Sequence, residues 1–262
     1  MPELPDVEQF KKYADSTIMN QQIKDVEFID KRMIAFSEKA IKKTLKEHQF
    51  INSKRIGKFL LLETDDEMHK WLVLHFGMTG ELEYFKDKKT PKYARMLIHF
   101  KNGYHLSLND PRLLGKIDLA DNPESYQKRK ELGVDALDVS EKQFKEILGK
   151  KKSRIKPTLM NQHLITGIGN VYADEILFQS KIHPTTNIDA LNNKTLGDLY
   201  KNMQMVLKTA IKDNADPKKF PDSFLIPNRR TKGKCPNCAG NIKKIKVAGR
   251  GTYFCPSCQG NG

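Results

Sequence analysis

Two cysteine motifs near the end of the chain, Cys235-Pro236-Asn237-Cys238 and Cys255-Pro256-Ser257-Cys258, guide the interpretation of the whole sequence. Sixteen residues separate the motifs, and together they contain all 4 cysteines of the chain. Each motif can supply two thiolates from a tight turn, so the pair predicts a tetrahedral site for one structural zinc ion. Two disulfides, or four unconnected thiols, are the alternatives. Four sulfur ligands would fill the zinc shell, which predicts a structural metal without an open catalytic position.

The chain is strongly basic, and the charge is concentrated towards its end. Its 262 residues carry a net charge of +14, and they are enough for about two domains. From Lys201 onward, 13 Lys and Arg stand against 3 Asp, and no acidic residue follows Asp222. This imbalance predicts a polyanionic partner, either nucleic acid or an anionic membrane surface.

No segment has the features of a membrane span or a signal peptide. No apolar run approaches 18 residues, and the N-terminus, Met1-Pro2-Glu3-Leu4-Pro5-Asp6, is acidic. Four cysteines that bind a metal as thiolates also suit a reducing compartment, where disulfides are rare. We therefore expect a cytoplasmic protein that does not contact a membrane.

The first half of the chain has the pattern of a β-sandwich. A helix is predicted over 5–18, because Pro5 and Asp6 suit a first helical turn and apolar residues then recur at helical spacing. Short runs with strand character are separated by connections rich in Gly, Asn and Asp. These runs are 23–30, 59–63, 71–76, 81–85, 94–100, 104–108 and 116–119.

The second half is helical up to the cysteines. Helices are predicted at 156–163, 170–180 and 195–212, with a further one at 141–148, and Asn170 is the expected N-cap of the second. We therefore predict an α+β fold with two lobes. Its parts are an N-terminal β-sandwich domain with flanking helices (1–130), a linker (131–152), a helical domain (153–234) and a zinc finger (235–262).

The N-terminus can carry covalent chemistry. Initiator methionine is usually removed before a small residue, and Pro2 would then expose a secondary α-amine. The pKa of an α-amine is about 7.7–8, so a useful fraction is unprotonated at neutral pH and can attack an aldehydic carbon. Glu3 could serve as its general acid and base. Many chains begin with Met-Pro by accident, so this pattern needs further support.

That support comes from three segments that resemble the formamidopyrimidine-DNA glycosylase family, whose sister branch is endonuclease VIII. They are Met1–Glu8, then Lys156-Pro157 with Leu164–Glu175, and Val247–Gln259. The second segment is similar to the family's helix–two-turns–helix, and the third to its zinc-finger hairpin. The resemblance covers the whole chain.

The resemblance implies a bifunctional base-excision repair enzyme, a glycosylase and abasic-site lyase. Its expected partner is double-stranded DNA that contains damaged bases or abasic sites, and it is expected to act as a nucleoid-associated monomer. The implied substrates are oxidised purines: formamidopyrimidines, 8-oxoguanine or its further oxidised products. No organic cofactor is required, because the α-amine performs the covalent step.

The resemblance also assigns roles to single residues. The implied catalytic residues are Pro2 as the nucleophile, Glu3 in proton transfer and sugar-ring opening, and Lys58 as a phosphate-binding catalytic lysine. Met78 would fill the gap left by the extruded base, with Leu114 as a second wedge, and Arg112 would probe the orphaned base. The implied DNA contacts are His75, Met78, Arg112, Leu114, Lys156, Asn170 and Arg250.

Two segments depart from the family pattern. Leu113-Leu114 stands where well-known bacterial members have arginine and phenylalanine, and a leucine cannot stack as an aromatic ring does. Residues 214–230 are rich in proline and do not resemble the flexible loop that closes over 8-oxoguanine. We therefore hypothesise that formamidopyrimidines, hydantoins or abasic sites are better substrates than 8-oxoguanine.

Two other functions remain open at this level. One is an endonuclease VIII-like glycosylase for oxidised pyrimidines, which Leu4 and Met78 disfavour. The other is a non-catalytic zinc-finger protein that binds damaged DNA. The set Pro2, Glu3 and Lys58 argues against the latter, because binding alone does not need all three.

Overall fold

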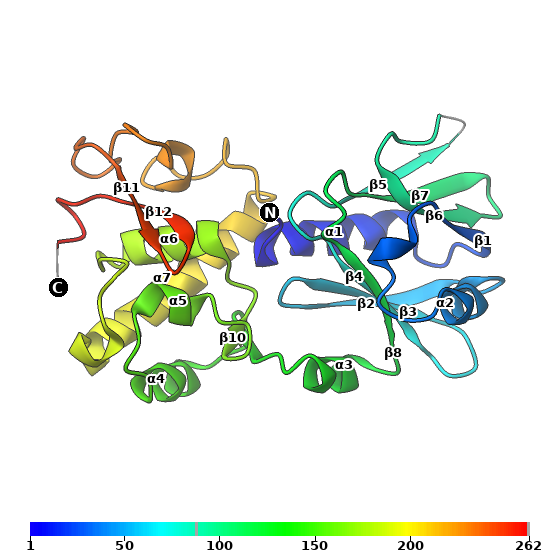
Figure 1. Cartoon of the computed structure of the whole chain (residues 1–262), viewed down its shortest axis with the longest axis horizontal. Helices are drawn as coiled ribbons and strands as arrows, with labels where there is room; N and C mark the ends of the chain where they lie inside the picture. Colours follow the sequence, from blue (N-terminus) through cyan, green and yellow to red (C-terminus); the bar gives the residue numbers. More distant parts are fainter. Residues whose placement is uncertain (87–88, 261–262) are drawn as a thin grey trace. The chain divides into compact units, whose positions relative to one another are not determined.

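Two four-stranded antiparallel sheets fill the first part of the chain in the computed structural model, which describes residues 1–86 and 89–260 (Figure 1). The first sheet has the strand order β1-β6-β7-β5 and the second the order β2-β3-β4-β8. Their strands are β1 Ile23–Phe28, β2 Phe50–Ile56, β3 Phe59–Thr64, β4 Trp71–His75, β5 Glu81–Lys86, β6 Ala94–Phe100, β7 Tyr104–Asn109 and β8 Lys116–Ala120. Three helices, α1 Leu4–Thr17, α2 Glu38–Leu45 and α3 Pro123–Arg129, and the 3-10 turn η1 Lys31–Met33 accompany them.

The two sheets share one hydrophobic core, as a sandwich requires. Val26 and Ile98 from one sheet and Leu60 and Leu72 from the other are at most 1% exposed and belong to the same cluster. The sandwich predicted from the alternating runs is confirmed. Strand β2 was missed because its sequence FINSKRI buries only its two end residues, so no regular alternation marks it.

The chain divides into two compact units, each of which consists of two separate segments of the sequence. Met1–Pro2 and Asp6–Glu131 form the first unit, whereas Glu3–Pro5 and Leu132–Gly262 form the second. The N-terminal tripeptide Glu3-Leu4-Pro5 thus packs with the second half of the chain. Leu4 is fully buried in the core of that unit.

The second unit is helical and ends in a β-hairpin. Its helices are α4 Glu141–Gly149, α5 Ile155–Leu159, α6 Asn170–Gln179 and α7 Asn193–Lys212, with the 3-10 turns η2 Ile188–Ala190 and η3 Ile226–Asn228. Strands β9 Val134–Asp135 and β10 Ile165–Thr166 form a small parallel pair, and β11 Lys243–Val247 pairs with β12 Arg250–Phe254. The hairpin β11–β12 packs on α6 (Figure 1).

Residues 131–152, expected to be a linker, are largely part of the second unit. They contain β9 and α4, and the buried side chains of Ala136, Phe144 and Leu148 belong to its core. Many charged residues of this segment lie on the exposed face of α4. A run of charged residues is also typical of a linker, which is why the sequence predicts one here. The last two residues of the predicted finger lie outside the described residues. Within the described residues, no helix has the length and apolar character needed to cross a membrane.

Candidate active site

The carboxylate of Glu3 lies at the start of α6 and accepts three backbone hydrogen bonds. Gly169 N and Tyr172 N donate to Oε2 at 2.9 and 3.1 Å, and Val171 N donates to Oε1 at 2.9 Å. The side chain therefore satisfies N–H groups that a helix leaves unpaired at its positive end. The residue is 1% exposed. Glu3, which follows Pro2 directly, is thus fixed in one position by the second unit.

The expected capping role of Asn170 is wrong. The N-cap residue of α6 is Gly169, and Asn170 is the first residue of the helix. A Cβ atom at Gly169 would lie 2.3 Å from Glu3 Cδ, so only glycine leaves room for the carboxylate. The anion at this helix end is the protein's own Glu3, which sequence reasoning could not place because 166 residues separate it from Gly169.

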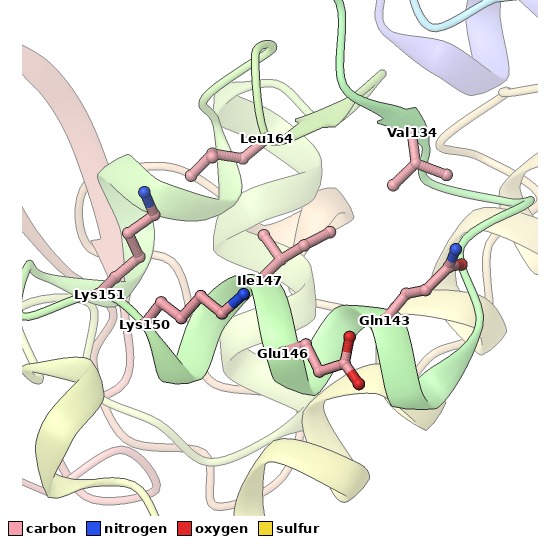
Figure 2. Close-up of a pocket in the computed structure, with 7 residues that line it drawn as sticks. All are labelled: Val134, Gln143, Glu146, Ile147, Lys150, Lys151 and Leu164. Atoms are coloured by element: carbon pink, nitrogen blue, oxygen red, sulfur yellow. The ribbon is translucent and has the colours of Figure 1, made fainter.

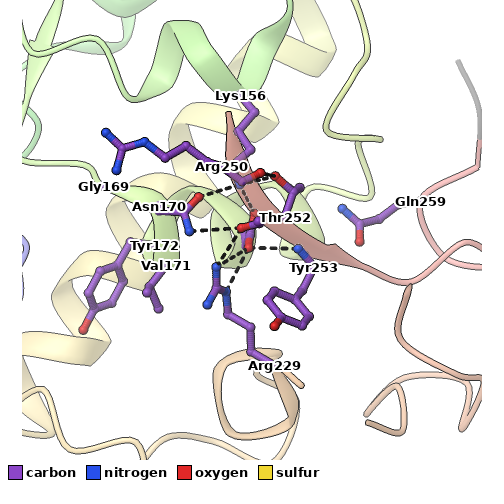
Figure 3. A network of polar contacts seen from close by, with 12 residues as sticks. Lys156, Gly169, Asn170, Val171, Tyr172, Arg229, Arg250, Thr252, Tyr253 and Gln259 are labelled. Atoms are coloured by element: carbon purple, nitrogen blue, oxygen red, sulfur yellow. Dashed lines mark hydrogen bonds and ion pairs between the residues drawn. The ribbon is translucent and has the colours of Figure 1, made fainter. Parts of the chain in front are cut away.

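Lys156 lies at the centre of a buried polar network (Figure 3). Its Nζ lies 2.8 Å from Asn170 Oδ1, 2.6 Å from Thr252 Oγ1 and 2.6 Å from Asp174 Oδ1. The residue is 1% exposed, and its burial lowers the pKa of the ammonium, while Asp174 opposes that shift. Lys156, predicted as a DNA contact, thus has two hydrogen bonds and an ion pair inside the protein, and its contact with DNA stays a prediction.

The same network holds Asn170 and the finger hairpin. Asn170 Nδ2 donates to Gly251 O at 3.1 Å, so both ends of this amide are engaged. Asp174 Oδ2 accepts from Arg229 Nε at 2.8 Å and from Tyr253 N at 3.0 Å. Sequence reasoning missed Asp174 and Arg229. The network joins α5, α6 and β12 into one rigid part.

Arg250 is exposed, whereas Lys156 is buried. It follows Ala248 and Gly249, whose φ angles of 45° and 78° form the tight turn between β11 and β12. Its side chain is exposed, and within the described residues no ion pair to it is found. A guanidinium at the tip of a hairpin can bind a phosphate through two parallel hydrogen bonds.

The four cysteines converge as a zinc site requires. Their Sγ atoms all lie within 4.8 Å of one another, with 3.7 Å between Cys235 and Cys258 and 3.5 Å between Cys238 and Cys255. Tetrahedral zinc with Zn–S bonds of about 2.3 Å places its sulfurs about 3.8 Å apart. All four thiols are free, so the disulfide alternative is excluded. The donor set and spacing fit one structural zinc ion.

The finger is attached to the helical part by Gln259. This fully buried side chain accepts from Cys255 N at 2.9 Å through Oε1 and donates to Ile182 O at 2.8 Å through Nε2. Phe178 of α6 packs in one cluster with Cys235 and Cys255. The metal site therefore stabilises the position of the hairpin that carries Arg250.

In the first unit, His75 is neutral near pH 7. Burial, and secondly the nearby charge of Lys58, lower its pKa from 6.5 to about 4, while Asp110 acts in the opposite direction. Gly77 N lies 3.3 Å from His75 Nδ1, which assigns Nδ1 as the acceptor and leaves the N–H on Nε2. Lys58 belongs to the two-residue turn between β2 and β3, which the Ile56–Phe59 pair closes. His75 can therefore donate one uncharged hydrogen bond to a phosphate.

Met78, Arg112 and Leu114 are exposed on two loops of the first unit. Met78 is 38% exposed and Leu114 44% exposed, both unusually high for large apolar side chains. The loop 77–80 connects β4 to β5, and the loop 110–115 connects β7 to β8. These three predicted DNA contacts thus lie at the surface. Asp110, which the sequence analysis did not single out, is buried beneath the second loop.

Residues 214–230 pack closely on the second unit. Phe220 and Phe224 are 7% and 2% exposed and belong to its core. Leu225 N and Ile226 N donate to the two oxygens of Glu175 at 3.1 and 2.7 Å. Burial raises the pKa of Glu175 to about 7, although these hydrogen bonds act against the shift. The two aromatic side chains and the hydrogen bonds to Glu175 anchor this segment, and its stiffness stays a prediction.

A separate hollow of about 400 Å³ lies beside α4 (Figure 2). Its apolar part consists of Val134, Ile147 and Leu164, and its polar rim is formed by other side chains of α4 and the residues that follow. These rim residues are Gln143, Glu146, Lys150 and Lys151. None of the predicted catalytic or DNA-binding residues lines it, so the candidate site is elsewhere.

Comparison with known proteins matches the three parts of the chain to three domains of one class of protein. The models are the formamidopyrimidine-DNA glycosylase N-terminal domain (residues 1–117), the formamidopyrimidine-DNA glycosylase H2TH domain (132–221) and the zinc finger found in FPG and IleRS (232–260). A β-sandwich, an H2TH domain and a four-cysteine finger in this order define a DNA glycosylase of base-excision repair.

Whole-chain comparisons identify the family. A formamidopyrimidine-DNA glycosylase of Mycoplasma mobile is 32% identical, with 99% of each chain covered. Among solved structures, a complex of Lactococcus lactis Fpg with abasic-site DNA has a TM-score of 0.90 at 32% identity, and covers 99% of this chain and 100% of that one. Another Lactococcus lactis Fpg complex, with DNA that contains an oxidised pyrimidine, has a TM-score of 0.91 at 31% identity and the same coverage. The chain belongs to the formamidopyrimidine-DNA glycosylase family.

Proposed function

We propose that the protein excises oxidised purines from double-stranded DNA and then cleaves the abasic site, with Pro2 as the nucleophile. The observation that carries the proposal is the position of Glu3. Its carboxylate is held by three backbone N–H groups at the start of α6, and Pro2 is its immediate neighbour in the chain. After removal of Met1, the secondary amine of Pro2 is attached to a residue with a fixed conformation, which favours attack in one orientation.

The covalent steps balance without any cofactor. The lone pair of Pro2 N forms a bond to C1′ of the damaged nucleotide, and the glycosidic bond breaks with its electron pair on the departing base, which takes up a proton. Opening of the sugar converts the adduct into an iminium, and the ring oxygen becomes a hydroxyl with a proton transferred through Glu3. Loss of a proton from C2′ then expels the 3′ phosphate, and a second elimination expels the 5′ phosphate. Hydrolysis of the iminium regenerates Pro2.

The DNA contacts follow from exposure and charge. Arg250 and Lys58 supply positive charge, and His75 supplies one neutral N–H donor to phosphates near the lesion. Met78 and Leu114 fill the gap left by the extruded nucleotide, and Arg112 contacts the orphaned base. Lys156 contributes indirectly, because it fixes the amide of Asn170 and the hairpin through Thr252. The zinc ion holds the hairpin and takes no part in bond breaking.

Substrate choice within the family follows from the two departures in sequence. The anchors at Phe220, Phe224 and Glu175 restrain the segment 214–230, so it cannot close freely over an extruded base. We therefore propose that formamidopyrimidines, hydantoins and abasic sites react faster than 8-oxoguanine. Equal single-turnover rates on 8-oxoguanine·C and formamidopyrimidine·C duplexes would reject this preference.

The central test is borohydride trapping on an abasic duplex. The wild-type protein should give a covalent adduct, and peptide mapping should locate it at Pro2. A Pro2→Gly variant, which has a primary amine, should form much less adduct, whereas Pro5→Gly, a proline three residues later, should still form it. An adduct at a lysine would overturn the assignment of Pro2.

The endonuclease VIII-like alternative is decided by a panel of lesions. A Lactococcus lactis relative has been solved with an oxidised pyrimidine in its DNA, so such bases belong in the panel. Faster excision of oxidised pyrimidines than of formamidopyrimidines would favour that alternative. Absence of any adduct from zinc-loaded protein lacking Met1 would favour a non-catalytic binder of damaged DNA.

A further inference from the structure

The side chain of Asp110 accepts hydrogen bonds from its own turn and also from a second loop. It is fully buried. Its Oδ2 accepts from Leu114 N and Gly115 N, both at 2.8 Å. Its Oδ1 accepts from Arg112 N at 3.1 Å and from Thr79 Oγ1 at 2.8 Å. Three of these donors belong to the loop 110–115, and the fourth comes from the loop 77–80.

The two loops also touch at the level of the backbone. Gly77 has a φ of 58°, and a Cβ atom there would lie 2.5 Å from the carbonyl carbon of Leu114. Any side chain at Gly77 would therefore push the loops apart. The main chain of Asp110 is anchored as well, because its N donates to Tyr93 O at 2.9 Å and its carbonyl accepts from Arg95 Nε at 2.8 Å.

The backbone next to Asp110 adopts a conformation that needs such support. Leu113 has a φ of 55°, which non-glycine residues rarely adopt. Leu113 packs against the sandwich core, whereas its neighbour Leu114 is 44% exposed. Hydrogen bonds from both sides of this residue to one carboxylate compensate for the strain and direct Leu114 outwards.

We infer that Asp110 is a positioning residue that holds Met78, Arg112 and Leu114 in one fixed arrangement. The inference rests on the proposed DNA contacts of these three side chains. A wedge formed by two independent loops would lose conformational entropy on each insertion into DNA. The hydrogen bond between Thr79 and Asp110 already restricts the conformations of both loops in the free protein. The three side chains can therefore enter the gap left by the extruded nucleotide together.

The experiment compares duplex DNA with single-stranded DNA. A duplex lesion leaves an orphaned base and a gap to fill, whereas a single-stranded abasic oligonucleotide has neither. Asp110→Asn turns an amide NH₂ towards backbone donors, and we expect excision from the lesion duplex to fall about tenfold or more. Discrimination between opposite bases should weaken by a similar factor. Cleavage of the single-stranded abasic oligonucleotide should change less than about twofold.

Thr79 isolates the contact between the loops. Thr79→Val preserves the shape and removes only the cross-loop hydrogen bond, so duplex excision should fall about threefold. Thr79→Ser, which keeps the hydroxyl, should restore the wild-type rate. Asp118→Asn is the matched control, because Asp118 is also buried in the first unit but pairs with Arg129 and Lys130. It should lower stability without altering the ratio of duplex to single-strand rates.

Binding to an uncleavable duplex separates this inference from the proposed function. A 2-aminopurine opposite a tetrahydrofuran abasic analogue reports whether side chains enter the gap. At saturating protein, the wild type should change its fluorescence strongly and Asp110→Asn much less, even if no covalent adduct ever forms. Equal fluorescence changes, equal duplex rates, or equal losses on both kinds of DNA would overturn the role of Asp110. Absence of wild-type trapping alone would overturn only the chemistry proposed for Pro2.

Discussion

Each unit of the protein contains a buried carboxylate that accepts hydrogen bonds from several backbone N–H groups. The two carboxylates, Asp110 and Glu3, differ in how far along the chain their donors lie. Asp110 accepts three of its four hydrogen bonds from residues at most five positions away. Glu3 accepts from three backbone N–H groups that lie 166 to 169 positions away. Both fix a functional segment, but Asp110 organises a turn that already exists locally, whereas Glu3 attaches the N-terminus to a helix formed much later in the chain.

This difference predicts how each of the two segments responds to an amino-acid substitution. A local turn retains part of its shape when one acceptor is weakened, because the chain still connects its parts. Pro2 directly precedes Glu3, whose carboxylate accepts hydrogen bonds from residues far along the chain, so its position depends on distant contacts. We therefore expect substitutions near Glu3 to affect activity most, and substitutions of exposed residues to affect it least.

The largest effect is expected for Glu3→Gln. Glutamine presents an NH₂ group to donors at the start of α6, and it cannot carry the proton that ring opening requires. Excision should fall by about 10²–10⁴-fold, the usual contribution of a general acid or base. Single-turnover kinetics on a lesion duplex would measure this.

Glu8→Gln is the matched control for Glu3. Glu8 is a carboxylate of α1, the helix that begins directly after Glu3, and its Oε2 accepts from Arg55 Nε at 2.8 Å. Its loss should leave the rate within about threefold of wild type, as expected for a single ion pair away from the chemistry. Equal losses in both variants would show that helix stability, and not the chemistry of Glu3, limits the reaction.

Lys156→Met should have the next largest effect, and mainly on stability. It leaves Asp174 and Asn170 without their buried cationic partner, and breaking a buried pair costs about 3 kcal/mol or more. Urea unfolding would report this loss. Lys145→Met, which breaks the half-exposed pair with Glu141, should leave the free energy of unfolding nearly unchanged. Equal costs would contradict the central position of Lys156.

The comparison between local and distant contacts also explains what the sequence alone could predict. Helix α7, Asn193–Lys212, was predicted over 195–212 because its apolar positions repeat regularly. The zinc ligands were predicted because each motif is short and its chemistry is specific. The buried partners of Lys156 at 170, 174 and 252 could not be predicted, because they come together only in the fold. The sequence could not place Glu3 at the start of α6 either, because 166 residues separate it from Gly169.

A smaller effect is expected from the pH response of His75, which lies near Asp110. Its pKa in the folded protein is about 4, against 6.5 as its ordinary value, so between these pH values the unfolded chain binds more protons. Stability therefore rises with pH through this window and is lost as the pH falls. His75→Gln should remove about 3 kcal/mol of this dependence, since the two pKa values differ by about 2.5 units. An unchanged slope in His75→Gln would show that the pKa of His75 is the same in the folded and the unfolded chain.

The smallest effect is expected for Arg250→Ala, which removes an exposed side chain without a described ion pair. Stability should stay within about 0.5 kcal/mol of wild type, whereas binding to an abasic-analogue duplex should weaken at low salt. One lost phosphate contact should lower the slope of log Kd against log salt by about 0.9. Lys243→Ala, an exposed lysine of β11, is the control for general charge. Equal slope changes would mean that the finger attracts DNA through its net charge alone, and a change specific to Arg250 would place a phosphate at the hairpin tip.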